Sequence, residues 1–199
     1  MSEATAAFEP AFSYHAPRWW GSRIMILLEC VAFAFLAFTY FYIRNSAGIW
    51  PPPPTPLPDL RLPSLTLLVL SIGAAPYWYA ARLAGLNARP RAIAGWLVLG
   101  VIFGISAIVL RGYDFAALHT RFNSSQYGAI TWAILIVHLA HLLAATLETS
   151  LVAAMLFSAP EEKGRYADVA AMAVYWYLIA FSWLAFYAIV FISPRFRVV

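Results

Sequence analysis

The chain contains five long apolar stretches, separated by short segments that are rich in charge or proline. A helix needs about 20 apolar residues to cross the ~30 Å hydrocarbon core of a bilayer. Apart from basic residues close to their ends, Glu29 and Glu148 are the only charged residues in these stretches, which do not resemble the alternating ten-residue strands of a membrane barrel. The sequence therefore predicts an all-α membrane protein, a single domain over residues 1–199 that forms a bundle of five transmembrane helices. The expected spans cover about residues 21–43, 64–82, 92–111, 127–157 and 169–192.

The composition excludes a soluble domain. Charged residues make up 11% of the chain and apolar residues 63%, whereas a soluble domain carries about 25% charged residues. The net charge is +4, but the basic residues are spread singly along the chain. Nucleic-acid binding would need a basic face, so no nucleic-acid partner is expected. The lone cysteine, Cys30, lies in an apolar run and allows no disulfide within the chain.

The segments between the spans fit this topology. The first connection, WPPPPTPLPDLRLP, is expected to be stiff and extended, because proline cannot continue a helix. The third connection, residues 112–126, is polar and is expected to fold over the membrane surface. The fourth, APEEKGR, is charged, and the acidic N-terminal segment does not resemble a cleavable signal peptide. Basic residues divide almost evenly between the two sides, so charge does not predict the orientation.

Four polar side chains are predicted at membrane depth, where they are costly and usually face protein or water. Glu29 lies in the first span, and His138, His141 and Glu148 lie in the fourth. At 100° per residue, these last three share one helix face within about 80°. We expect this face to pack inward or to meet a partner, and we expect all other charged side chains to lie at span boundaries, in loops or in tails.

These residues do not predict a metal or haem site. His138 and Glu148 are ten residues apart, which is about 15 Å along a helix, too far for one ion. We expect the two histidines to make structural hydrogen bonds. Glu29 and Glu148 are candidates for proton handling or for lipid contact. Phosphate-binding loops, nucleophile elbows and zinc-protease motifs are absent from the sequence, so we expect no catalytic centre and no cofactor in this chain. Gly95, Gly100 and Gly104 are expected to let helices approach closely.

The ordered motifs resemble subunit III of the haem-copper terminal oxidases, in its five-helix bacterial form. The resemblance covers about residues 18–195 and rests on four stretches. The first span, MILLECVAFAFLAFTYFY, has Glu29 where the family has a membrane-embedded glutamate, and Trp50-Pro51-Pro52 follows it. A short LP.L..L.LS entry, here residues 62–71, opens the second span. LRGYDFAALHTRFNSSQYG, with Asp114, Tyr127 and Gly128, precedes the fourth span, which contains the family's His-x-x-His as His138 and His141. The last span contains YWYLIAFSW, similar to the family's Tyr-Trp-His-Phe-Val-Asp-Val-Val-Trp.

The resemblance implies a non-redox accessory subunit of a bacterial haem-copper oxidase, which would be a cytochrome c or a quinol oxidase. Its main contact would be subunit I, which carries the haem and copper, with subunit II and other oxidase subunits as further partners. It would bind phospholipids, stabilise the catalytic subunit and support proton uptake. The resemblance also implies a bacterial plasma membrane location with a cytoplasmic N-terminus.

Two alternatives stay open at the sequence level. Tyr177 stands where the family often has His, and Ala180 where it often has Asp. These departures also fit a subunit-III-like accessory protein of a nitric oxide reductase. The second alternative is an independent proton or solute transporter that uses Glu29 and Glu148, although the odd number of spans disfavours a simple inverted-repeat plan.

Overall fold

The computed structural model describes residues 17–158 and 165–196 and confirms the predicted fold class. In these residues there are five long α-helices and no strand, and all five helices are long and apolar enough to cross a membrane. The helices are α1 (Pro17–Ser46), α2 (Arg61–Gly85), α3 (Pro90–Ala116), α4 (Gln126–Ser158) and α5 (Arg165–Tyr187), and α5 continues into the π-helix η1 (Ala188–Ile192) and the 3-10 turn η2 (Ser193–Arg195). The predicted acidic N-terminal segment and most of the fourth connection lie outside the described residues.

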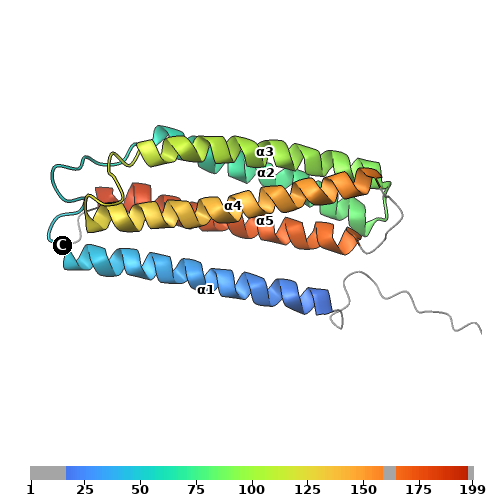
Figure 1. The fold of residues 1–199 in the computed structure, drawn as a ribbon, viewed down its shortest axis with the longest axis horizontal. Coiled ribbons are helices and arrows are strands. Elements are labelled where there is room, and N and C mark those ends of the chain that lie inside the picture. Colours follow the sequence, from blue (N-terminus) through green and yellow to red (C-terminus); the bar gives the residue numbers. More distant parts are fainter. Residues whose placement is uncertain (1–16, 159–164, 197–199) are drawn as a thin grey trace, which may run out of the picture.

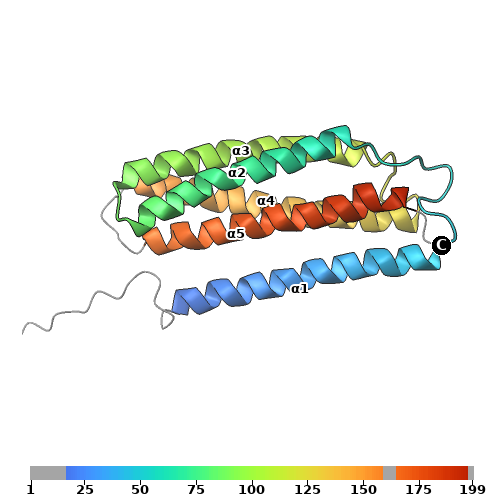
Figure 2. The ribbon, with the colours of Figure 1, turned by 180° about the vertical axis from the view of Figure 1, so that it is seen from behind.

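Four of the helices form a compact bundle, and the fifth lies beside it. Helices α2, α3, α4 and α5 pack closely together, whereas α1 runs along the side formed by α4 and α5 (Figures 1 and 2). In the most apolar part of α1 only 11% of the residues are buried, against 33–44% in the other helices. Most of the α1 surface therefore faces away from the bundle, toward the lipid or a partner.

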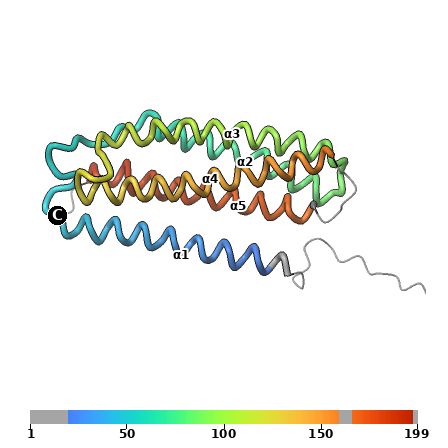
Figure 3. Tube along the Cα trace, in the orientation of Figure 1, coloured from blue at the N-terminus to red at the C-terminus, as the bar shows by residue number. Residues whose placement is uncertain are grey.

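The first and third connections meet at one end of the molecule, as the trace in Figure 3 shows. The backbone N–H of Asp59 donates to the carbonyl of Ala117 at 2.9 Å, which joins the two connections. Ser125 begins α4 by accepting a hydrogen bond from the Gly128 N–H at 3.1 Å, the usual task of a serine at a helix N-terminus. The predicted third connection is shorter than expected, because α3 continues to Ala116.

The same end fastens α1 to the C-terminal turn. Arg44, near the end of α1, is 7% exposed and donates to Ser193 Oγ at 2.9 Å and to the carbonyl of Phe196. Arg195 donates to the carbonyl of Pro58 at 2.6 Å. These charge-assisted hydrogen bonds hold α1, the first connection and the C-terminal turn together.

Glycine allows the closest helix contacts in the bundle, but not at every predicted position. A Cβ on Gly104 would lie 2.5 Å from Thr146 Oγ1, and a Cβ on Gly100 would lie 2.7 Å from the Tyr77 ring. These two predictions are confirmed, because only a residue without a side chain fits there. The prediction for Gly95 is wrong, since a Cβ on that residue would meet nothing within 4 Å.

Candidate functional site

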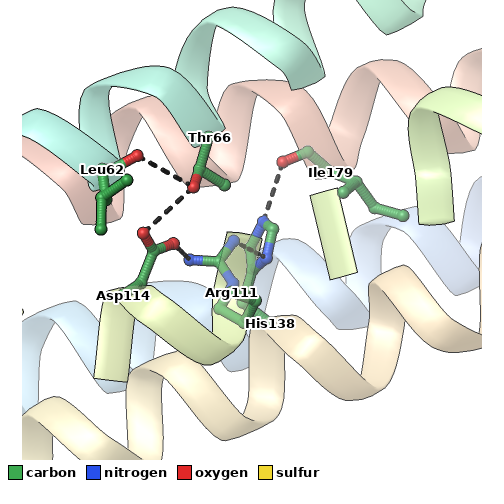
Figure 4. A network of polar contacts seen from close by, with 6 residues as sticks. All are labelled: Leu62, Thr66, Arg111, Asp114, His138 and Ile179. Carbon is green, nitrogen blue, oxygen red and sulfur yellow. Dashed lines mark hydrogen bonds and ion pairs between the residues drawn. The ribbon is translucent and has the colours of Figure 1, made fainter. Parts of the chain in front are cut away.

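A buried ion pair lies near the end of α3, where the sequence predicted only boundary and loop charges. Arg111 and Asp114 have side chains that are 0% exposed, and Arg111 Nη1 lies 3.1 Å from Asp114 Oδ2 (Figure 4). They are three residues apart on one helix, so their side chains lie on the same face. The second carboxylate oxygen, Oδ1, accepts a hydrogen bond from Thr66 of α2 at 3.0 Å. Arg111, predicted at a span boundary, and Asp114, predicted in the third connection, both lie within α3 with fully buried side chains.

The Arg111 guanidinium also joins α3 to α4 and α5. Its Nη2 lies 3.1 Å from His138 Nδ1, and its Cζ lies 3.5 Å from the centre of the Trp183 ring. A guanidinium only donates hydrogen bonds, so Nδ1 is the acceptor and the imidazole proton is on Nε2. That proton is donated to the carbonyl of Ile179 at 3.0 Å. His138 is neutral in this arrangement and has no free nitrogen.

This network, made of Thr66, Arg111, Asp114, His138, Ile179 and Trp183, connects all four helices of the bundle. Its single positive charge is balanced by its single negative charge, and the aromatic face of Trp183 further stabilises the cation. Both Nη atoms of Arg111 have hydrogen-bond partners, whereas its buried Nε has none among the described residues. Removal of one partner of a fully buried pair is strongly destabilising. The network therefore specifies how the four helices pack. The prediction that His138 makes structural hydrogen bonds is confirmed.

A second polar cluster lies between α1 and the bundle. Glu29 of α1 accepts a hydrogen bond on Oε1 from the Tyr175 hydroxyl of α5 at 3.1 Å. Its Oε2 lies 3.6 Å from His141 Nε2 of α4, and the Glu29 and His141 side chains are 17% and 23% exposed. Phe33, one turn further along α1, packs against the rings of both His138 and His141. Glu29 of the first span thus lies against His141 of the fourth span, although more than a hundred residues separate them.

The predicted shared face of α4 has a graded environment. His138 is fully buried, His141 is partly buried, and Glu148 is exposed on the bundle surface. Of the two arrangements expected for this face, His138 shows inward packing, whereas Glu148 lies where a partner or lipid would have to meet it. Since ten residues carry it about 15 Å along α4, the two histidines and Glu148 do not form one site. Among residues 17–158 and 165–196, no three His, Cys, Asp or Glu side chains gather in a way that could hold a metal ion. Cys30 is exposed on α1.

An open pocket of about 820 Å³ lies at the end of the molecule where the first and third connections meet. His119 and Asp59 form an exposed pair beside it, with His119 Nε2 3.0 Å from Asp59 Oδ2. The pocket is lined by residues of both connections, among them Pro52, Pro54, Thr120, Arg121, Ser124 and Trp132. Its walls are mainly apolar, and its position places it near the end of the transmembrane helices.

Sequence reasoning missed Arg111, Asp114 and Tyr175 as parts of polar clusters. A usable signal existed for the ion pair: opposite charges three residues apart at the end of an apolar run, followed by more apolar residues. For Tyr175 there was no comparable signal, because its partner is on another helix. No family model matches this chain.

Proposed function

We propose that this chain is a non-redox accessory subunit of a bacterial haem-copper terminal oxidase, comparable to subunit III. Electron transfer and oxygen reduction would take place in subunit I, which holds the haem and copper, with subunit II beside it. This chain would stabilise the catalytic subunit, bind phospholipids and support proton uptake. In this proposal it is a multi-pass protein of the bacterial plasma membrane with its N-terminus in the cytoplasm.

One observation carries the proposal. Glu29 lies against His141 at the contact between α1 and the bundle, and Phe33 of the same helix packs against both His138 and His141. Their spacing in the sequence does not require this contact. In a family whose motifs form one local site, these residues are expected to lie in contact. In an unrelated apolar helix bundle, this contact is not expected.

The exposure of α1 and the position of Glu29 fit an accessory role. A large part of α1 faces outward and is available to lipid or to a larger subunit. Glu29 is held by Tyr175 at the edge of the bundle, and 17% of its side chain remains exposed. Its Oε2 atom is itself buried. A carboxyl group at membrane depth is a candidate to exchange a proton or to contact a lipid headgroup.

The departures at Tyr177 and Ala180 favour a second candidate, the accessory protein of a nitric oxide reductase. Both residues are on α5, and both are partly buried. This candidate shares the architecture and the accessory role and differs in the catalytic subunit that it contacts.

Co-purification tests these proposals. The chain would carry an affinity tag and be extracted from its native membrane in a mild detergent, and a visible reduced-minus-oxidised spectrum would be recorded. We expect a haem-copper catalytic subunit to accompany the chain, and its haem signature and mass would identify an oxidase or a nitric oxide reductase. Recovery of the chain from its native membrane without any haem-containing partner would refute both. Proton or solute flux in liposomes that contain only this chain would instead support an independent transporter.

A matched pair of substitutions tests Glu29 within the complex. Glu29→Gln keeps the size and the ability to accept from Tyr175 but cannot ionise. We expect assembly to be retained, with a change in lipid retention or in the rate of proton uptake. Asp59→Asn is the control, because Asp59 pairs with His119 at the surface and lies outside this cluster. An oxidase with unchanged turnover, lipid content and inactivation rate after Glu29→Gln would contradict a role for this residue.

A further inference from the structure

The hydrogen bonds of His141 define which of its nitrogens carries a proton. His141 Nδ1 lies 2.6 Å from the carbonyl oxygen of Val137, one turn earlier on α4. A carbonyl only accepts hydrogen bonds, so Nδ1 is the donor and carries a proton. In the neutral ring the other nitrogen, Nε2, is then a bare acceptor, and it faces Glu29 Oε2 at 3.6 Å.

Glu29 Oε2 is in a matching position. This oxygen is buried and has no hydrogen-bond partner among the described residues, while Oε1 is occupied by the Tyr175 hydroxyl. Two acceptors with free lone pairs therefore face each other across a gap slightly longer than a hydrogen bond. One proton in this gap would satisfy both atoms, and a small side-chain movement would close the distance.

We propose that Glu29 and His141 form a site that binds one exchangeable proton between Oε2 and Nε2. With the proton bound, the pair is either a carboxylate with an imidazolium or a carboxylic acid with an imidazole, and both forms make the hydrogen bond. On release, the proton leaves to water or to a neighbouring carrier, and the pair changes from neutral to a single negative charge. Removal of that proton leaves a carboxylate opposite an imidazole lone pair.

The groups around the pair separate the roles of the two histidines. On α4, His138 cannot join the exchange, because Arg111 donates to its Nδ1 and its Nε2–H is donated to Ile179. On α5, Tyr175 donates to Oε1 and orients the carboxyl group, so it is a positioning residue.

The remaining acidic groups on this side are Glu148 of α4 and Asp168 of α5. Glu148 is exposed on the bundle surface. Asp168 acts electrostatically on Glu148, and Glu148 acts electrostatically on Tyr175. Thus one histidine of the His-x-x-His motif holds the bundle together and the other handles the proton. As a step in proton uptake this inference rests on the proposed function, whereas the proton site itself is a property of this chain alone.

Nitrogen NMR of labelled histidine tests the site in the purified full-length chain in lipid nanodiscs. The chain has four histidines, so single substitutions to glutamine assign each signal. At high pH we expect His141 to be neutral with its proton on Nδ1, and His138 to keep its proton on Nε2 throughout the titration. A His141 ring with its proton on Nε2 at high pH would overturn the proposal.

Infrared difference spectroscopy over the same pH range tests the coupling. Because two groups that share a proton titrate as a pair, we expect the Glu29 carboxyl band and the His141 ring signal to change at one midpoint. We expect His141→Gln to uncouple the Glu29 carboxyl band from that change. Asp59→Asn, in the exposed pair with His119, is the control and should leave both signals unchanged.

A Glu29 carboxyl band that titrates identically with and without His141 would refute the proposal. Should His141→Gln fail to fold, Tyr175→Phe replaces it, since loss of the donor to Oε1 must also move the shared midpoint. Neither readout requires an oxidase, so a failed co-purification and a failed proton site are separate outcomes.

Discussion

The buried pair of Arg111 and Asp114 leads to a prediction about non-additive stability. Two unit charges 3.1 Å apart attract by about 5 kcal/mol at an effective dielectric constant near 20. Asp114→Asn removes this attraction but keeps an oxygen that can accept from Thr66. It leaves a guanidinium that cannot lose its charge inside the bundle. We therefore expect Asp114→Asn to lower the free energy of unfolding by about 3–5 kcal/mol.

The second substitution separates the charge from the packing. Arg111→Met alone removes the donor to His138, at about 1–3 kcal/mol for the unsatisfied nitrogen. It also removes the contact of the cation with Trp183, which is worth up to about 2 kcal/mol. In the background of Asp114→Asn, however, Arg111 is an unpaired buried charge. Its replacement then removes the destabilising burial of that charge together with the stabilising contacts to His138 and Trp183, and the two effects oppose each other. We expect Arg111→Met to change stability by less than about 1 kcal/mol in that background.

The measurement is equilibrium unfolding of the two single variants and the double variant in mixed micelles with increasing SDS, followed by helix content. Asp59→Asn is the control, since Asp59 pairs with His119 at the surface and such pairs are worth about 0–1 kcal/mol. Additive effects of the two buried substitutions, within about 0.5 kcal/mol, would refute the reasoning that they form one charge-balanced unit.

The glycines provide two further tests. Gly104→Ala should destabilise the protein by about 1–3 kcal/mol, because its Cβ would lie 2.5 Å from Thr146 Oγ1. The Cβ of Gly95→Ala on the same helix would meet nothing within 4 Å, so this substitution should be neutral or stabilising by up to about 1 kcal/mol. Thermal unfolding in detergent measures both variants, and equal effects of the two would contradict this packing. Gly128→Ala should be more damaging than Gly104→Ala, because its Cβ would lie 2.2 Å from the backbone carbonyl of Arg121, which cannot rotate away as a threonine side chain can. An expression and gel-filtration comparison of these variants checks that order.

The sequence alone was sufficient for the five spans and the all-α architecture. Span length and apolarity are properties of each segment by itself, because a bilayer requires every spanning helix to satisfy its own backbone hydrogen bonds. The helices proved longer than the predicted spans at most of their ends, since a helix continues past the charged residues that mark the hydrocarbon boundary. Glu29 was also recognisable from the sequence, as a carboxyl group in the middle of an apolar run.

The tertiary structure decided which polar residues act together. Whether a charge near a span end is peripheral or buried depends on partners from other helices, and for Arg111 these are His138 and Trp183. Partners from other helices also distinguish His138 from His141. The two are equivalent in the sequence motif, but Nε2 of His138 faces the Ile179 carbonyl and Nε2 of His141 faces Glu29. Apolar length is encoded within one segment, whereas compensation of a buried charge is a property of several helices packed together. For that reason the five membrane-spanning helices could be predicted, and the buried ion pair could not.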